Sequence, residues 1–249
     1  MIWIGTSGWQ YRDWRRRFYP RDLAQRDWLP FFSERFATVE VNNSFYRLPE
    51  ADTFVAWRDR SAAGFRFAVK ASRYITHVRR LRDAAGPVRT FMERARRLGD
   101  KLGPVLYQLP PNFPADPDRL AAFLEGLPRD PPAAFEFRHP SWDDTGVRGL
   151  LDAHDCAWVL ADRPGWRYRE VVTGGWAYVR FHQGQRTAPG YARRKLATWA
   201  GRLADLPARD VYVYFNNDTG GAALRDGATL TELLRARRVP VRGAREAPP

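Results

Sequence analysis

Residues 177–184 read AYVRFHQG, and this stretch alternates as a β-strand does. Successive side chains of a strand point to opposite sides, so Tyr178, Arg180 and His182 share one face, while the other face is apolar. A strand on the surface of a protein would turn its charged face to water. A strand buried on both sides would direct these charges into a shared interior, and the rest of the chain indicates which arrangement holds.

Seven further runs of β-branched and aromatic residues resemble this one, with amphipathic segments of helical spacing between them. The eight runs are 2–5, 38–42, 65–70, 105–109, 134–138, 157–162, 177–182 and 211–216. The clearest helical segments are 28–36, 88–102, 118–127, 192–206 and 230–238. Alternating strands and helices predict an α/β fold with a parallel sheet, and eight units predict a single TIM-like (β/α)8 barrel. We expect one barrel domain at 1–242 and a flexible C-terminal tail at 243–249.

The composition suits one large domain. Of the 249 residues, 44% are hydrophobic and 14% are aromatic, which is ample material for a core. The single cysteine, Cys156, forms no disulfide within the chain and is typical of a reducing compartment. The sequence contains neither a signal-peptide pattern nor a run of roughly 20 apolar residues. It therefore predicts a cytoplasmic protein without a membrane partner.

The formal net charge is +13, which favours an anionic partner, either a small molecule or a nucleic acid. Arginine supplies 38 of the 41 basic residues. A genome that prefers arginine codons would produce the same ratio without any functional reason. The charge alone therefore leaves both explanations open.

The strands share a pattern in which one face is apolar throughout and the other becomes polar near the carboxyl end. In a barrel, the apolar face packs on the helices, and the polar ends meet at the mouth, where barrel enzymes carry their reactive groups. The side chains predicted to converge there are Glu40, Asn42, Lys70, Gln108, Glu136, Arg138, Asp162, Arg180, His182 and Asn216. The alternative is a purely structural network, since buried charges must be paired in any protein.

Five motifs in order resemble the domain-of-unknown-function 72 family, also called YecE-like. They are GTSGW (5–9), EVNNSFY (40–46), LPP (109–111), FRHPSW (137–142) and FNN (215–217). The resemblance spans nearly the entire chain and implies a TIM-like barrel, but it leaves the reaction open. The family's barrel has been likened to that of endonuclease IV, although a shared fold is a weak guide to function.

The charges predicted at the mouth suggest two kinds of chemistry. Arginine and lysine suit a phosphate or carboxylate, and a glutamate or histidine suits proton transfer or activation of water. The predicted catalytic residues are Glu40, Lys70, Glu136, Asp162 and His182. The predicted ligand-binding residues are Asn42, Gln108, Arg138, His139, Arg180, Asn216, Asn217, Trp9 and Tyr11. Asn217 has the alternative role of capping the next helix.

A divalent metal is a weaker alternative, and we predict no cofactor. Carboxylates and the imidazoles of His139 and His182 are suitable ligands. However, the chain has four histidines and no HxH or HExxH pair, and the nearby basic side chains would repel a cation. We assign no special role to the remaining histidines, His77 and His154.

Loops expected at the same end of the barrel interleave arginine with aromatic residues. The first such loop contains Trp9, Tyr11 and Trp14, the second contains Tyr74, and the third contains Trp166. This pattern is typical of proteins that bind single-stranded nucleic acid, in which rings stack on bases and guanidiniums follow phosphates. The alternative is that these rings pack beneath long loops.

The leading hypothesis is a barrel enzyme that acts on a phosphate-bearing substrate, which includes nucleic acid, by hydrolysis or acid/base chemistry. A non-catalytic nucleic-acid-binding protein is the second hypothesis. A glycosidase or sugar isomerase is the third, but it is disfavoured because Glu40 and Glu136 are expected far apart around the barrel. The sequence does not indicate the substrate or the oligomeric state.

Overall fold

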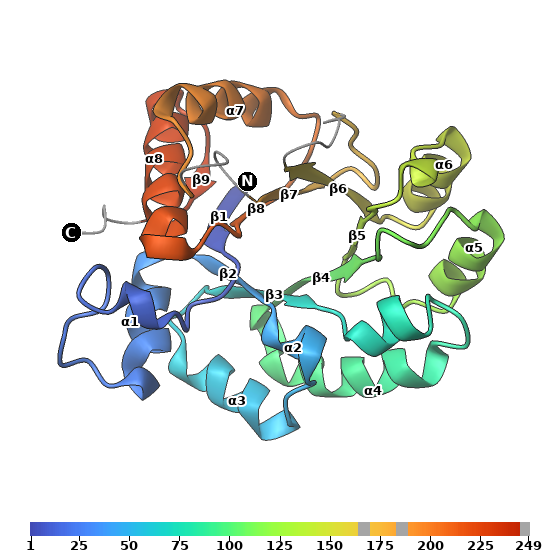
Figure 1. The fold of residues 1–249 in the computed structure, drawn as a ribbon, viewed down its shortest axis with the longest axis horizontal. Helices are drawn as coiled ribbons and strands as arrows, with labels where there is room; N and C mark the ends of the chain where they lie inside the picture. Colours follow the sequence, from blue (N-terminus) through green and yellow to red (C-terminus); the bar gives the residue numbers. More distant parts are fainter. Residues whose placement is uncertain (164–169, 183–188, 245–249) are drawn as a thin grey trace.

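The computed structural model describes residues 1–163, 170–182 and 189–244. Eight parallel strands form a closed ring with helices around it, as the end-on view in Figure 1 shows. The order of the strands follows the sequence from β2 to β8, and β1 closes the ring by pairing with both β8 and β2. The predicted (β/α)8 barrel is therefore confirmed.

Each of the eight predicted runs forms a strand of the barrel. The strands are β1 (Ile2–Thr6), β2 (Thr38–Val41), β3 (Arg66–Lys70), β4 (Leu102–Gln108), β5 (Ala133–Glu136), β6 (Ala157–Asp162), β7 (Ala177–Phe181) and β8 (Val211–Phe215). A short additional strand, β9 (Val241–Arg242), pairs with the first two residues of β1. The strands of the ring are staggered, so β2 pairs only with Gly5 and Thr6 at the end of β1. β9 pairs with the start of β1, which β2 does not reach.

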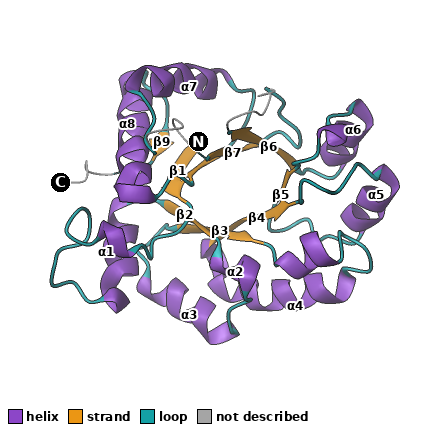
Figure 2. Ribbon diagram, viewed as in Figure 1, coloured by secondary structure: helices purple, strands orange, loops and turns teal. Residues whose placement is uncertain are grey.

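The described residues form eight α-helices. Figure 2 shows in purple how the helices surround the ring. They are α1 (Trp28–Arg35), α2 (Asn43–Tyr46), α3 (Ala51–Arg60), α4 (Ala85–Ala95), α5 (Pro117–Glu125), α6 (Thr145–Ala153), α7 (Arg193–Asp205) and α8 (Ala222–Ala236). The five predicted segments correspond to α1, α4, α5, α7 and α8. Side chains of Asp116 and Asp144 cap the amino ends of α5 and α6 by accepting backbone N–H groups.

The strands separate two hydrophobic clusters. The larger one lies between the strands and the helices and contains Phe67, Phe135, Trp158 and Val179. The smaller one fills the barrel and is built by Ala68, Leu106, Ala134, Val159, Tyr178 and Tyr214. Neighbouring residues of a strand therefore belong to different clusters, which confirms that the alternation seen in AYVRFHQG divides an interior face from a helix-packed face.

The glycine that ends the first predicted run is required by the closure of the ring. A Cβ atom on Gly5 would lie 2.1 Å from the carbonyl oxygen of Thr38, so only glycine allows β1 and β2 to approach. In the loop that follows β1, Gly8 has a φ of 110°, which side-chain-bearing residues rarely adopt. The glycines of GTSGW thus have structural roles.

The start of the expected tail is packed against the barrel. Ala244 is buried, and its backbone N–H donates to Thr231 Oγ1 of α8 over 3.2 Å. Residues 245–249 of the expected tail lie outside the described residues. Within the described parts of the chain, every helix is too short or too polar to cross a lipid bilayer.

Candidate functional site

A cavity of about 530 Å³ opens where the carboxyl ends of the strands meet. Six side chains that the sequence predicts at this mouth line it: Asn42, Lys70, Gln108, Arg138, Arg180 and Asn216. Tyr11, from the loop after β1, lines it as well. Residues separated by more than a hundred positions converge because the strands are parallel and end at the same side of the ring.

An ion cluster of three buried residues lies next to this cavity. Arg180 on β7 donates from Nη2 to Glu40 Oε1 on β2 over 2.8 Å, and from Nη1 to Glu136 Oε2 on β5. Glu40 also accepts hydrogen bonds of 2.7 Å from Ser7 Oγ and from the hydroxyl of Tyr178. One guanidinium therefore joins two carboxylates from opposite parts of the barrel, so the expectation that the two glutamates are far apart is wrong.

The cluster holds both carboxylates in the ionised form. Burial disfavours the charge of Glu40, but Arg180 and the hydrogen bond from Ser7 outweigh burial and lower the pKa of the carboxyl. Burial also opposes the charge of Glu136, and Arg180 again prevails, so the pKa lies well below its usual range. The two carboxylates in turn raise the pKa of Arg180 despite its burial.

Lys70, the last residue of β3, has different surroundings. Its Nζ donates to Oε1 of Gln108 over 2.9 Å and lies 4.0 Å from the centre of the Phe45 ring. The amide of Gln108 is oriented by its other end, because Nε2 donates to the carbonyl of Leu109 over 3.0 Å. The direct contacts of this buried ammonium are thus a neutral amide and an aromatic ring.

The pKa of Lys70 falls to about 8, chiefly because burial disfavours its charge. The positive charge of Arg180 acts in the same direction. The negative charges of Glu136 and Glu40 oppose this shift but do not cancel it. Near neutral pH, Lys70 therefore exists in both its charged and its neutral form.

Loops that follow the strands complete the lining of the cavity, and one of them contributes a histidine that the sequence did not single out. His77, in a π-helical turn (Tyr74–Val78) after β3, lines the cavity and packs edge-on against Phe45. Burial and the charge of Lys70 lower the pKa of His77 to about 4. Its position in the loop directly after β3 was the only signal in the sequence that could have identified it, because such loops form the mouth of a barrel.

Asp218 also lines the cavity, and it follows the FNN motif after β8. Burial raises the pKa of Asp218. Burial raises the pKa of Tyr11 too, and the negative charge of Asp218 adds to that effect. A carboxylate thus faces the cavity on the side formed by the loops after β1 and β8.

His182 lies beside the ion cluster, although it is not among the residues that line the cavity. Its Nε2 is 3.6 Å from Glu136 Oε1, and its Nδ1 is 3.3 Å from Asn216 Nδ2. Because Asn216 donates from Nδ2, this contact indicates that Nδ1 accepts and that the proton of the neutral imidazole is on Nε2. His182 therefore presents an N–H group towards Glu136.

Asp162 lies outside the mouth, and its predicted position is wrong. It belongs to the helix-packed face of β6 together with Trp158. Its carboxylate contacts α7, where it accepts from Lys195 Nζ over 2.8 Å and from Trp199 Nε1 over 3.0 Å. Since β6 is apolar on both faces before this residue, the sequence gave no means of deciding which face points inward.

Asn217 and His139 also have structural contacts away from the cavity. Asn217 donates from Nδ2 to Asp226 of α8 over 2.6 Å, so the helix-directed alternative describes it better than ligand binding. His139 Nδ1 lies 2.8 Å from Ser141 Oγ and accepts the backbone N–H of the same residue, which caps a short 3-10 helix.

The aromatic residues of the first loop are part of the hydrophobic core. Trp9 is buried and packs edge-on against Trp57 of α3, with 5.3 Å between ring centres. Trp14 is fully buried beside Phe32 of α1. For this loop, the alternative that the rings pack beneath the chain is the correct one. In the second loop Tyr74 is exposed, and Trp166 of the third loop lies outside the described residues.

Across the described ranges, no group of three or more histidine, cysteine, aspartate or glutamate side chains is arranged to hold a metal ion. The two histidines considered as ligands, His139 and His182, have the separate contacts given above. No donor set in the described chain therefore supports a metal site.

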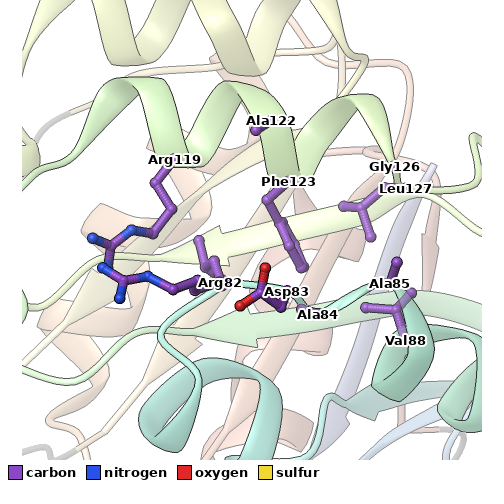
Figure 3. A pocket seen from close by; sticks show the side chains of 11 residues that line it. Arg82, Asp83, Ala84, Ala85, Val88, Arg119, Ala122, Phe123, Gly126 and Leu127 are labelled. Carbon is purple, nitrogen blue, oxygen red and sulfur yellow. The ribbon is translucent and has the colours of Figure 1, made fainter.

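A second cavity, of about 300 Å³, lies between α5 and the amino end of α4. Figure 3 shows Phe123 and Val88 on its apolar walls and the guanidiniums of Arg82 and Arg119 at one end. Arg119 is paired with Asp116 over 2.7 Å. None of the predicted site residues lies here, so the mouth of the barrel is the better candidate site.

Comparison with protein families and curated relatives agrees with this fold. The model of a family described as "Protein of unknown function DUF72" matches residues 3–249. The UPF0759 protein YunF of Bacillus subtilis is 28% identical, and the match covers 94% of this chain and 95% of that protein. The UPF0759 protein YecE of Escherichia coli K12 is 31% identical over 66% of this chain and 60% of that protein.

Solved structures give the same result. A DUF72 family protein from Thermotoga maritima MSB8 matches with a TM-score of 0.83 at 27% identity, covering 94% of this chain and 99% of that one. A DUF72 family protein from Enterococcus faecalis V583 matches with a TM-score of 0.80 at 20% identity, over 94% and 96% of the two chains. At that identity the second match speaks for the fold alone. The names of these proteins state no ligand or reaction.

Proposed function

The chain belongs to the DUF72 family of proteins of unknown function, and on that premise we propose that the mouth of its barrel binds a small phosphate-bearing molecule and exchanges protons with it. Arg138 and Lys70 bind the anionic group. Lys70 is the residue that transfers protons. The carboxylates Glu40 and Glu136 hold the cationic side chains in place.

The observation that carries this proposal is a buried cation without a counter-ion. No carboxylate of the described residues lies within salt-bridge distance of Lys70, whose contacts are Gln108 and the ring of Phe45. A buried ammonium is unfavourable unless an opposite charge or several acceptors compensate it. An anionic ligand in the cavity supplies that charge.

Arg138 provides the second positive group. Its Nε donates to Glu136 Oε1 over 2.8 Å, and its side chain is about one quarter exposed at 26%. This ion pair fixes the guanidinium at the edge of the cavity, where its terminal nitrogens can bind two oxygens of a phosphate. Asn42, whose buried Oδ1 accepts no hydrogen bond in the described protein, offers an acceptor for a hydroxyl of the same ligand.

Lys70 suits acid/base chemistry better than the two glutamates do. The carboxylates are held ionised by Arg180 and accept several hydrogen bonds, so they are poor proton acceptors at neutral pH. A general acid or base is most effective when its pKa is close to the working pH. With a pKa of about 8, Lys70 meets that condition.

The two alternative functions find less support. A glycosidase holds the sugar between its two carboxyl groups, but here the guanidinium of Arg180 joins Glu40 to Glu136. Nucleic-acid binding by stacking on the first loop is weakened because Trp9 and Trp14 are buried. Tyr46, at 82% exposure on the rim of the cavity, is the ring best placed to cover a small ligand.

Calorimetric titration with inorganic phosphate and inorganic pyrophosphate tests the proposal. We expect Arg138→Gln to weaken the affinity by about tenfold, because a charge-assisted hydrogen bond contributes about 1.5 kcal/mol or more. Arg89→Gln removes the same charge from the exposed face of α4 and should leave the affinity unchanged.

Equal losses in both variants, or no heat of binding from either anion, would overturn the proposal. A single-stranded oligonucleotide serves as the third ligand in the same experiment. If it binds more tightly than pyrophosphate, with an affinity that falls steeply with salt, the ligand is nucleic acid rather than a small molecule.

A further inference from the structure

The chain contains three lysines, and their contacts differ sharply. Lys101 donates from Nζ to the carbonyls of Arg58 and Ser61 over 2.6 and 2.7 Å. Lys195 is paired with Asp162 over 2.8 Å. Lys70 is the lysine that faces a cavity, and within the described structure its Nζ has one hydrogen-bond acceptor.

We propose that Lys70 is a nucleophilic amine that forms a Schiff base with the carbonyl carbon of the ligand. The substrate class is then an aldehyde or ketone that carries a phosphate group. The inference rests on the proposed function for the phosphate, which Arg138 binds, and it adds the covalent step at Lys70.

The reaction balances without any co-reactant. The neutral amine of Lys70 attacks the carbonyl carbon, and the C=O π bond breaks to give a carbinolamine. Two protons leave the lysine nitrogen in all, one from the ammonium before the attack and one from the carbinolamine, and both are taken up by the oxygen. The C–O bond of the carbinolamine then breaks, and the oxygen leaves as water. Overall, an ammonium and a carbonyl give a protonated imine and one molecule of water, with no change in charge or oxidation state.

Three features of the site favour this step. Gln108 Oε1 accepts one hydrogen from Nζ and leaves the lone pair of the neutral amine free to point elsewhere. The face of Phe45 stabilises a cation, which suits the protonated imine. Glu40 and Glu136 are held in place by their hydrogen bonds with Arg180, so neither carboxylate is free to pair with Lys70.

The protonation of Lys70 agrees with this role. Burial and Arg180 bring its pKa to about 8, with Glu136 and Glu40 opposing and Arg138 assisting. His77, which shares the cavity, has its own pKa at about 4 and is neutral near pH 7. Lysines that form Schiff bases are activated in this way, by desolvation or by a neighbouring cation.

The test compares two aldehyde probes, pyridoxal 5′-phosphate and 5′-deoxypyridoxal, which lacks the phosphate and also the hydroxyl that would close an internal hemiacetal with the aldehyde. The full chain is incubated with each probe near neutral pH, the imine is reduced with borohydride, and labelled peptides are quantified by mass spectrometry. We expect Lys70 to be labelled at least about tenfold faster than Lys195, because burial lowers the pKa of Lys70 to about 8 and the cavity gives the probe access to its Nζ. With three lysines in the chain, the assignment is direct.

Two variants separate reactivity from folding. Lys195→Gln should leave the labelling of Lys70 unchanged. Gln108→Glu keeps the lysine but sets a carboxylate beside Nζ, which raises its pKa. We expect about tenfold slower labelling near neutral pH and recovery of the rate at higher pH. Thermal unfolding of each variant shows that it is folded.

The outcomes distinguish this inference from the proposed function. Labelling of Lys70 no faster than that of Lys195 overturns the Schiff base, and phosphate binding by calorimetry is then judged separately. Fast labelling by both probes at equal rates supports the nucleophile but speaks against the phosphate site. Fast labelling by the phosphorylated probe alone, lost in Arg138→Gln, supports both.

Discussion

Lys70 is buried and Lys101 is half-buried, but the two ammonium groups differ in the number of oxygens that accept their hydrogens. Lys101 lies at the end of a short 3-10 helix (Arg96–Lys101), and its Nζ donates to three oxygens, two of them on Ser61. These oxygens lie at the carboxyl end of α3, so Lys101 caps that helix. Lys70 has the same three donor hydrogens, but in the described structure one amide oxygen accepts from it.

If Lys70 is the nucleophile proposed above, the number of hydrogen-bond acceptors around the ammonium, and not burial alone, distinguishes it from the structural Lys101. An ammonium has three donors and no acceptor. When three oxygens receive them, the charge stabilises the fold. When a single oxygen does, the remaining donors or the lone pair are available to a ligand. Burial lowers the pKa of both lysines, and it brings the pKa of Lys70 to about 8.

The largest expected effect that tests this difference between the two lysines is the change in the free energy of unfolding with pH that Lys70 causes. Its pKa falls from 10.5 to about 8 on folding. A lowered pKa in a base means that the unfolded chain binds more protons between these values, so stability rises as pH increases from about 8 to about 10.5. Each tenfold change in acidity is worth about 1.4 kcal/mol, which gives a gain of up to about 3 kcal/mol.

Lys70→Met removes this titration. We expect the free energy of unfolding of the unaltered protein, measured by urea denaturation, to rise relative to that of the variant across this pH range. Lys195→Met is the matched control and should follow the unaltered protein. If the free energies of unfolding of Lys70→Met and the unaltered protein differ by a constant amount from pH 7 to pH 10, burial does not lower the pKa of Lys70.

A smaller effect is expected at Lys101. Lys101→Met removes three hydrogen bonds and leaves the carbonyls of Arg58 and Ser61 without this partner. We expect a loss of about 1 to 2 kcal/mol in the free energy of unfolding. The labelling of Lys70 by pyridoxal 5′-phosphate should be unchanged, because α3 lies outside the ring. Slower labelling of Lys70 in Lys101→Met would show that the reactivity of Lys70 depends on Lys101. The two lysines would then not have separate roles.

The fold could be predicted from the sequence because it depends on repeated local patterns. All eight strands were identified from short runs of β-branched and aromatic residues, and the ring follows from their number. The convergence of Lys70, Gln108 and Arg180 could be predicted for the same reason. In parallel strands, the carboxyl ends meet wherever the strands themselves are correctly placed.

The rest of the site depends on information that alternation does not contain. Asp162 was misplaced because β6 is apolar on both faces, so its direction is decided by whether Trp158 fits the barrel or the helix layer. Trp14 is surrounded by arginines in the sequence, but a long loop needs its own core, and the ring fills it. His77 was overlooked because no strand pattern governs the turn that places it.

The smallest expected effect concerns His77, which tests whether the cavity is as cationic as its lining implies. Burial and the charge of Lys70 lower the pKa of His77 from 6.5 to about 4. The unfolded chain binds more protons between these values, so this residue makes the protein less stable as pH falls from about 6.5 towards 4. Partial exposure to solvent keeps the effect small.

An NMR titration of the four histidines, with His77→Asn for assignment and His154→Asn as control, measures the pKa directly. Lys70→Met should move the pKa of His77 back towards 6.5, since it removes a positive charge from the same cavity. A titration of His77 at its ordinary value in the unaltered protein would mean that the mouth does not repel protons, and the case for an anionic ligand would weaken with it.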